Sequence, residues 1–79
     1  MLFCSSNGMK YDIKIHKNVA MTGDLITINY PNSNWNIFEC GIDVQQEIIY
    51  WDNCRKYNID IPDDLREYCR KLVKNIILL

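Results

Sequence analysis

The chain of 79 residues has few of the side chains that form catalytic and metal sites. It contains one histidine, His16, and its four cysteines stand alone, whereas structural zinc sites draw on closely spaced ligand pairs. A cross-strand cluster of Cys4, His16 and Cys40 is the one metal site that the sequence leaves open. No base is evident beside any cysteine, and His16 falls on the polar side of its strand pattern. The sequence therefore predicts no metal, no cofactor and no enzymatic activity.

The sequence also has no large excess of positive or negative charge. Nine lysine and arginine residues stand against ten aspartate and glutamate residues, which gives a net charge of −1. General nucleic-acid binders usually carry a strong basic excess, and anionic lipid attracts clustered bases. No apolar run approaches the roughly 20 residues that cross a bilayer. Because no secretory signal is recognisable either, we expect a cytoplasmic protein with reduced thiols and no membrane association.

The strongest pattern present lies near the C-terminus. Pro62 suits a first helical position, and the acidic Asp63 and Asp64 suit the positive end of the helix dipole. Apolar residues follow at steps of three and four, the period of one helix face. They are Leu65, Cys69, Leu72, Val73, Ile76 and Leu79. The sequence predicts an amphipathic helix over residues 62–77, which needs an apolar surface to cover.

A second helix is predicted over residues 44–57. Gly41 ends the preceding pattern, and Asp43 with Gln46 matches a capping box, which marks the start of a helix. A connector of about four residues, 58–61, separates the two helical patterns, and connections this short usually join antiparallel neighbours. The second half of the chain is therefore predicted to be a two-helix hairpin.

Strand patterns fill the first half of the chain. The candidate strands are residues 2–5, 9–16, 24–30 and 35–40. The dipeptide Asn7-Gly8 between the first two is a strong signal for a β-hairpin. An unstructured leader is the alternative for the first strand, and a short helix is the alternative for the last. We predict one α+β domain over residues 1–79, an antiparallel sheet of about two to four strands covered by the two-helix hairpin.

One candidate binding site is a polar turn at residues 31–34. Proline, asparagine and serine each favour turn geometry, and Trp35 follows directly. A large aromatic side chain beside polar amides is common in the hot spots of protein interfaces. Asn32, Asn34 and Trp35 are therefore predicted to contact a partner protein, and a core position is the alternative for the tryptophan.

A second candidate site is acidic. Asp60, Asp63 and Asp64 surround the start of the C-terminal helix, where they could imitate phosphate charge toward a basic partner. Complementarity to the helix dipole is the simpler explanation for the last two. At the other end of that helix, Ile77 and Leu78 cannot both join its buried face. They are predicted to contact a second copy of the chain, with folding back onto the core as the alternative.

These observations predict a small protein that binds another protein and blocks part of its surface. The short chain, its many isoleucines and asparagines, and the lack of an active-site motif are typical of immunity proteins, antitoxins and phage or mobile-element inhibitors. The alternative is a nucleic-acid-binding or transcription accessory protein that uses the basic row of the helical hairpin. That row consists of Arg66, Arg70, Lys71 and Lys74. Acidic residues on the same helix, including Glu67, offset it.

Overall fold

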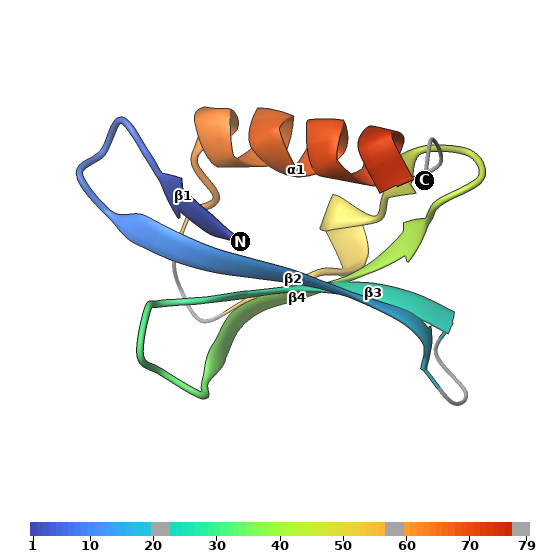
Figure 1. Ribbon diagram of the computed structural model, residues 1–79, viewed down its shortest axis with the longest axis horizontal. Helices are drawn as coiled ribbons and strands as arrows, with labels where there is room; N and C mark the ends of the chain where they lie inside the picture. The colour runs from blue at the N-terminus through green and yellow to red at the C-terminus, as the bar shows by residue number, and fades with distance from the viewer. Residues whose placement is uncertain (20–22, 57–59, 77–79) are drawn as a thin grey trace.

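An antiparallel sheet curls beneath one α-helix in the computed structural model, which describes residues 1–19, 23–56 and 60–76 (Figure 1). The six strands are β1 (Leu2–Cys4), β2 (Lys10–Val19), β3 (Gly23–Asn29), β4 (Asn36–Asp43), β5 (Ile48–Ile49) and β6 (Arg55–Lys56). A short 3-10 helix, η1 (Trp51–Asn53), precedes β6, and the α-helix α1 spans Asp63–Ile76. Within the described residues, no helix is both long and apolar enough to cross a bilayer.

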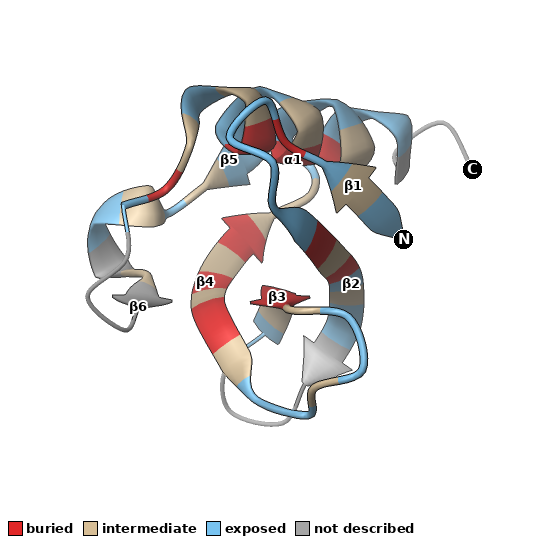
Figure 2. Cartoon of the chain, turned by 90° about the vertical axis from the view of Figure 1, so that its left-hand side faces the viewer, coloured by how far each residue is buried: buried red, intermediate tan, exposed pale blue. Residues whose placement is uncertain are grey.

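The strands follow one another across the sheet as a meander. Their order is β1-β2-β3-β4-β5. The strand β6 pairs with the same edge of β4 as β5 does, but nearer the start of β4. The hairpin predicted at Asn7-Gly8 joins β1 to β2, and Gly8 has a φ of 87°, which glycine adopts without a steric penalty. Figure 2 shows the curl, in which β1 and β5 rise on opposite sides of α1 and β3 lies farthest from it.

Alternation of apolar side chains places the core on the concave face. Cross-strand neighbours form rows across β2, β3 and β4, for example Ile13 opposite Ile28 and Ile28 opposite Phe38. All three side chains are at most 2% exposed. From the other side, Leu65, Cys69 and Val73 of α1 enter the same core and are fully buried. Burial of these rows, at about 25 cal/mol per Å² of apolar surface, is the main force that holds the helix on the sheet.

The helix predicted over residues 44–57 is wrong. Gly41 lies inside β4, and residues 44–47 form a turn that leads into β5, η1 and β6. The Asp43 carboxylate does accept the N–H of Gln46, at 3.0 Å, but it does so within this turn. Backbone pairing explains the outcome, because β5 and β6 provide partners for the outer edge of β4 that a helix cannot provide. The predicted sheet of two to four strands under a two-helix hairpin is therefore corrected to six strands and one α-helix among the described residues.

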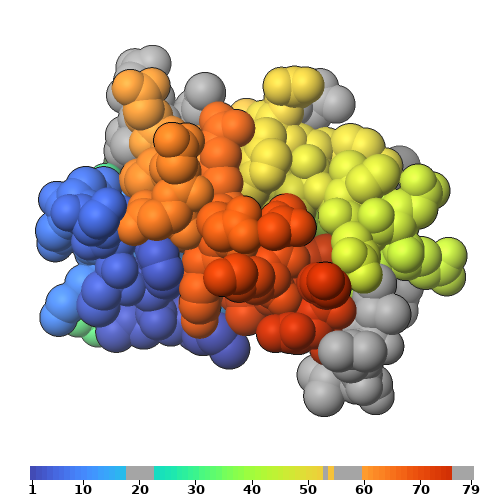
Figure 3. All heavy atoms as spheres, turned by 90° about the horizontal axis from the view of Figure 1, so that it is seen from above, coloured from blue at the N-terminus to red at the C-terminus, as the bar shows by residue number. Residues whose placement is uncertain are grey.

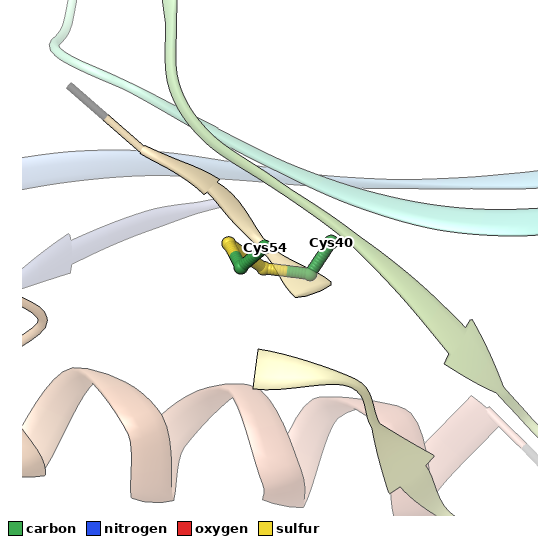
Figure 4. The surroundings of a disulfide bond; sticks show 2 residues. All are labelled: Cys40 and Cys54. Carbon is green, nitrogen blue, oxygen red and sulfur yellow. A yellow bond between two sulfur atoms is a disulfide. The ribbon is translucent and has the colours of Figure 1, made fainter. Parts of the chain in front are cut away.

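A disulfide bond reinforces this edge of the sheet. Cys40 of β4 is bonded to Cys54, which follows η1, and their Cα atoms are 4.2 Å apart (Figure 4). Cys4 and Cys69 keep free thiols, and burial raises the pKa of the Cys69 thiol to about 12 because the thiolate is disfavoured away from water. The prediction that all thiols are reduced is thus corrected. Because Cys40 is committed to this bond, the proposed metal cluster with Cys4 and His16 does not form.

Candidate functional site

A pocket of about 470 Å³ lies between α1 and the segment that contains β5 and η1. The α1–η1 pocket is lined by Glu47, Ile49, Trp51, Asp63, Arg66, Glu67 and Arg70. Figure 3 shows this face, with residues of the α1 helix in orange beside the yellow-green segment that precedes them in sequence. Ile49 and Trp51 are half-buried and provide its apolar part, whereas the charged residues are exposed around them. A cavity of this size is within the usual range for binding a small ligand or a few side chains of a partner.

The regular geometry of α1 positions one wall of the α1–η1 pocket. Asp63 and Glu67 are four residues apart, as are Arg66 and Arg70, so that each pair repeats on neighbouring turns of one face. The opposite wall begins at Glu47, which has a φ of 57° in the turn between β4 and β5. This left-handed conformation is costly for a residue other than glycine, and residues held in it often lie at functional sites.

Both arginine side chains of the α1–η1 pocket are held by contacts with neighbouring residues. Arg70 donates from Nη2 to Glu67 Oε1 at 2.6 Å and from Nε to Glu67 Oε2 at 3.2 Å. This hydrogen-bonded pair lowers the pKa of Glu67 and raises the pKa of Arg70. The guanidinium of Arg66 lies over the Trp51 ring, 5.4 Å from its centroid, in a cation–π contact. Among the described side chains, Glu47 and Asp63 form no ion pair.

The α1–η1 pocket combines charged groups of both signs with an aromatic ring. Among the described residues that line it, the charged groups are carboxylates and guanidinium groups, with no histidine, cysteine, serine or lysine. The described residues also contain no group of three or more side chains that could hold a metal ion. An aromatic ring with carboxylates around it is instead a chemistry that binds cations.

The predicted partner-binding turn has its side chains in water. Trp35 is 61% exposed, and Asn32 and Asn34 beside it are exposed as well. Ser33 holds the turn through two hydrogen bonds, since its N–H donates to the carbonyl of Tyr30 and its Oγ accepts the N–H of Trp35. Trp35 is therefore not a core residue. Figures 1 and 2 both show the connection between β3 and β4 on the side of the sheet away from α1, so this turn and the α1–η1 pocket are separate surfaces.

The predicted acidic site is divided by the structure. Asp63 lines the α1–η1 pocket, Asp60 is exposed before the helix, and Asp64 turns toward the β1–β2 hairpin. There it accepts the backbone N–H of Ser6 at 2.7 Å and the hydroxyl of Ser5 at 2.8 Å. Asp64 is thus a structural residue that ties the N-terminal hairpin to the start of α1. Ile77 and Leu78, the predicted homodimer contact, lie outside the described residues.

The contacts of Asp64 predict a loss of stability in acid. The hydrogen bond from the Ser6 N–H, assisted by the Ser5 hydroxyl, lowers the pKa of Asp64 in the folded state. Its stabilising contribution is therefore complete above the pKa of the unfolded chain, about 3.9, and is lost as the pH falls through the lower folded value. We expect Asp64→Asn to lower the melting temperature at pH 7 and to flatten its fall between about pH 5 and pH 3, measured by circular dichroism.

The matched control for this experiment is Asp63→Asn, one residue earlier on α1. It removes the same charge from the first helical turn but none of the hydrogen bonds to Ser5 and Ser6. At pH 7 it should lower the melting temperature less than Asp64→Asn does. Equal melting temperatures of the two variants would mean that the tie to the hairpin contributes nothing.

Half of the α1–η1 pocket was missed by sequence reasoning. Glu47, Ile49 and Trp51 belong to the segment that was predicted as helix, and their approach to α1 depends on how β5 pairs with β4. The β-branched pair Ile48-Ile49 was the one local signal for a strand there. Arg66 and Arg70 were noticed only as part of a basic row, and the structure pairs them with Trp51 and Glu67 instead.

Comparison of the chain with protein-family models, with curated proteins and with solved structures gives no match.

Proposed function

We propose that this protein binds another protein and acts by covering part of its surface. The observation that carries the proposal is Trp35, a large aromatic side chain that is 61% exposed at the end of a hairpin. Tryptophan is enriched among the residues that dominate binding energy at protein interfaces, and more than half of the Trp35 surface is open to a partner. Asn32 and Asn34 place amide donors and acceptors next to it.

The sheet acts as a scaffold that holds the turn at residues 31–34 in place. The β3–β4 pairing ends with an irregularity between Ile28 and Asn29, and the Asn29 side-chain amide donates to the carbonyl of Ser33 at 3.1 Å. The turn is therefore held from beneath by a side chain that is itself only 9% exposed. A binding loop held in this way loses little conformational entropy when a partner docks. Immunity proteins, antitoxins and phage inhibitors are the types of protein that fit this mode of steric blocking.

The nucleic-acid alternative loses its structural basis. It relied on a helical hairpin with a free basic row, and residues 44–56 form no α-helix. Arg70 is paired with Glu67, and Arg66 is engaged with Trp51. Lys71 and Lys74 are the bases of that row that remain exposed without such contacts, which is a small footprint for phosphate binding.

A cytoplasmic location stays a prediction from the sequence. The Cys40–Cys54 bond favours an oxidising compartment instead, since cytosolic reductants keep most thiols reduced. The proposed binding mode is compatible with either compartment.

The role of Trp35 is tested by capturing partners from the native cell with the tagged protein. A partner retained by the wild type should be lost from Trp35→Ala, with affinity reduced by about 30-fold or more, because hot-spot truncations cost about 2 kcal/mol or more. Titration calorimetry with the identified partner measures the change. Circular dichroism of Trp35→Ala checks that the variant keeps the folded state, so that a loss of affinity is assigned to the binding surface.

The control for the capture experiment is Tyr50→Ala, which removes another exposed aromatic side chain from a different part of the surface. It should retain the partner with unchanged affinity. Two results would contradict the proposal: capture of no partner at stoichiometric level by the wild type, or unchanged affinity of Trp35→Ala for the partner that is captured.

A further inference from the structure

We propose that the α1–η1 pocket is a second binding site, separate from the Trp35 turn, and that it takes a short extended peptide segment with basic side chains. The proposal rests on the shape of the pocket and on the balance of charges around it. It does not depend on the function proposed for Trp35.

The charge balance identifies the class of ligand. Among the described residues that line the α1–η1 pocket, three are carboxylates and two are guanidinium groups. Both guanidinium groups are engaged, Arg70 by Glu67 and Arg66 by the Trp51 ring. The two acids without an ion pair among the described side chains are Glu47 and Asp63. The described lining thus has more negative than positive charge, and an anionic ligand would find no unengaged base among those residues.

The Trp51 ring supports the same choice. It already accepts one guanidinium, that of Arg66, at 5.4 Å from its centroid. Cation–π contacts of this kind strengthen when the ring is partly removed from water, as the half-buried Trp51 is. The chain's own arginine therefore shows that this part of the pocket is suited to a basic group.

The layout of the α1–η1 pocket indicates an extended segment rather than a single side chain. Asp63 is seven residues from Arg70 on α1, and a rise of about 1.5 Å per residue separates these ends by about 10 Å. The negative charge of Glu47 helps to raise the pKa of Arg70, and Trp51 contacts Arg66. The segment 47–51 therefore runs antiparallel to the helix. Asp63 and Glu47, the two carboxylates without an ion pair among the described side chains, accordingly lie toward opposite ends of the pocket. Alternate side chains of an extended peptide are about 7 Å apart. Two long basic side chains at such positions can therefore reach carboxylates that are about 10 Å apart.

Nuclear magnetic resonance of the oxidised, 15N-labelled protein tests the proposal with a defined probe. The probe is the capped tripeptide acetyl-Arg-Ala-Arg-amide, and its neutral counterpart replaces both arginines with citrulline, which keeps the shape and removes the charge. The arginine probe should shift the amides of residues 47–51 and the indole N–H of Trp51 in a saturable way, while the indole N–H of Trp35 stays in place. The citrulline probe should bind at least about tenfold more weakly, because charge-assisted hydrogen bonds are roughly twice as strong as neutral ones.

Single substitutions then test which charged side chains of the pocket contribute to binding of the arginine probe. Glu47→Gln and Asp63→Asn should each weaken binding of the arginine probe by about five- to tenfold. Arg66→Ala should tighten it, because a competing cation leaves the Trp51 ring. Asp60→Asn is the matched control, since it removes one exposed acid outside the pocket and should leave the affinity unchanged. All four side chains are exposed, so the variants are expected to remain folded, which their spectra show directly.

Three outcomes would overturn the proposal. They are equal binding of the arginine and citrulline probes, an equal loss of affinity in Asp60→Asn and Asp63→Asn, and shifts that spread over the surface without saturation. Trp35→Ala separates the two sites. It should leave binding of the probe intact, so that failure at one surface does not count against the other.

Discussion

Replacing Phe38 with alanine is expected to lower the free energy of unfolding by about 3–5 kcal/mol. Phe38 is fully buried at the centre of the concave face, opposite Ile28 of β3 and beside the partner strand β6. Its removal leaves a cavity at the point where β4 meets both neighbours. Small domains have only about 5–15 kcal/mol of stability in total, so this variant should be substantially destabilised at room temperature. Urea denaturation followed by circular dichroism measures the change.

Phe38→Leu is the matched comparison for the alanine variant. It keeps most of the apolar volume and should cost less than about half as much, in the range usual for hydrophobic swaps in a core. Trp35, which is exposed and lies three residues earlier in the sequence, serves as a second reference, since Trp35→Ala should lower stability much less than Phe38→Ala does. A loss below about 1 kcal/mol for Phe38→Ala would contradict the assignment of Phe38 to the centre of the core.

Removing the disulfide is expected to destabilise the protein by about 3 kcal/mol, as the entropy of a closed loop of about 15 residues implies. Cys40 and Cys54 are 14 residues apart, and the loop between them contains the turn at 44–47, β5 and η1. Without the bond, those elements keep only short pairings to β4. The double variant Cys40→Ala with Cys54→Ala should therefore melt well below the wild type. Addition of dithiothreitol should lower the midpoint of the wild type but not that of the double variant.

A thiol count provides the control for this result. Denatured wild type without reductant should react at two thiols, those of Cys4 and Cys69, because the other two cysteines are bonded. Cys4→Ser should keep the response to dithiothreitol, since Cys4 is exposed and takes no part in the bond. Reaction at all four cysteines in protein isolated from its native cell under alkylating conditions would show that the bond does not form there, and the reduced-thiol prediction would then stand.

The disulfide also stabilises one wall of the α1–η1 pocket. The N–H of Cys54 donates to the carbonyl of Trp51 at 3.1 Å, so the disulfide holds the residue that follows the pocket's aromatic floor. The bond to Cys40 thus braces η1 against the sheet.

Elements that depend on local patterns were predictable from the sequence. The apolar period and acidic first turn of residues 62–77 correspond to α1, Asp63–Ile76. Asn7-Gly8 predicted a hairpin, and residues 10–16 of the alternating run 9–16 lie within β2. In each case the information lies within a few residues, because side-chain periodicity and turn conformation are local properties.

The segment 44–57 was not predictable in this way. Its apolar residues recur at helical spacing, and Asp43 with Gln46 imitates a capping box. The competing force is the unpaired outer edge of β4, whose backbone groups need partners. That need arises only after β3 and β4 have paired, and tertiary context then overrides local propensity.

The two proposed binding surfaces also differ in how far the sequence predicts them. The polar turn with its tryptophan was recognisable from composition, whereas its exposure depends on which side of the sheet it occupies. The acidic residues near the start of α1 were visible as a group, but their separation into Asp63 at the pocket and Asp64 at the hairpin required the packed structure.

By itself, the sequence determined that the chain has an amphipathic C-terminal helix, alternating strands and no active-site motif. These follow from composition and from spacings of two to four residues. Only the tertiary structure decided the pairing of β5 and β6 with β4, the bond between Cys40 and Cys54, and the α1–η1 pocket that depends on both. The reason is physical: hydrogen bonds across a sheet and contacts between distant segments are formed by residues whose positions no local pattern specifies.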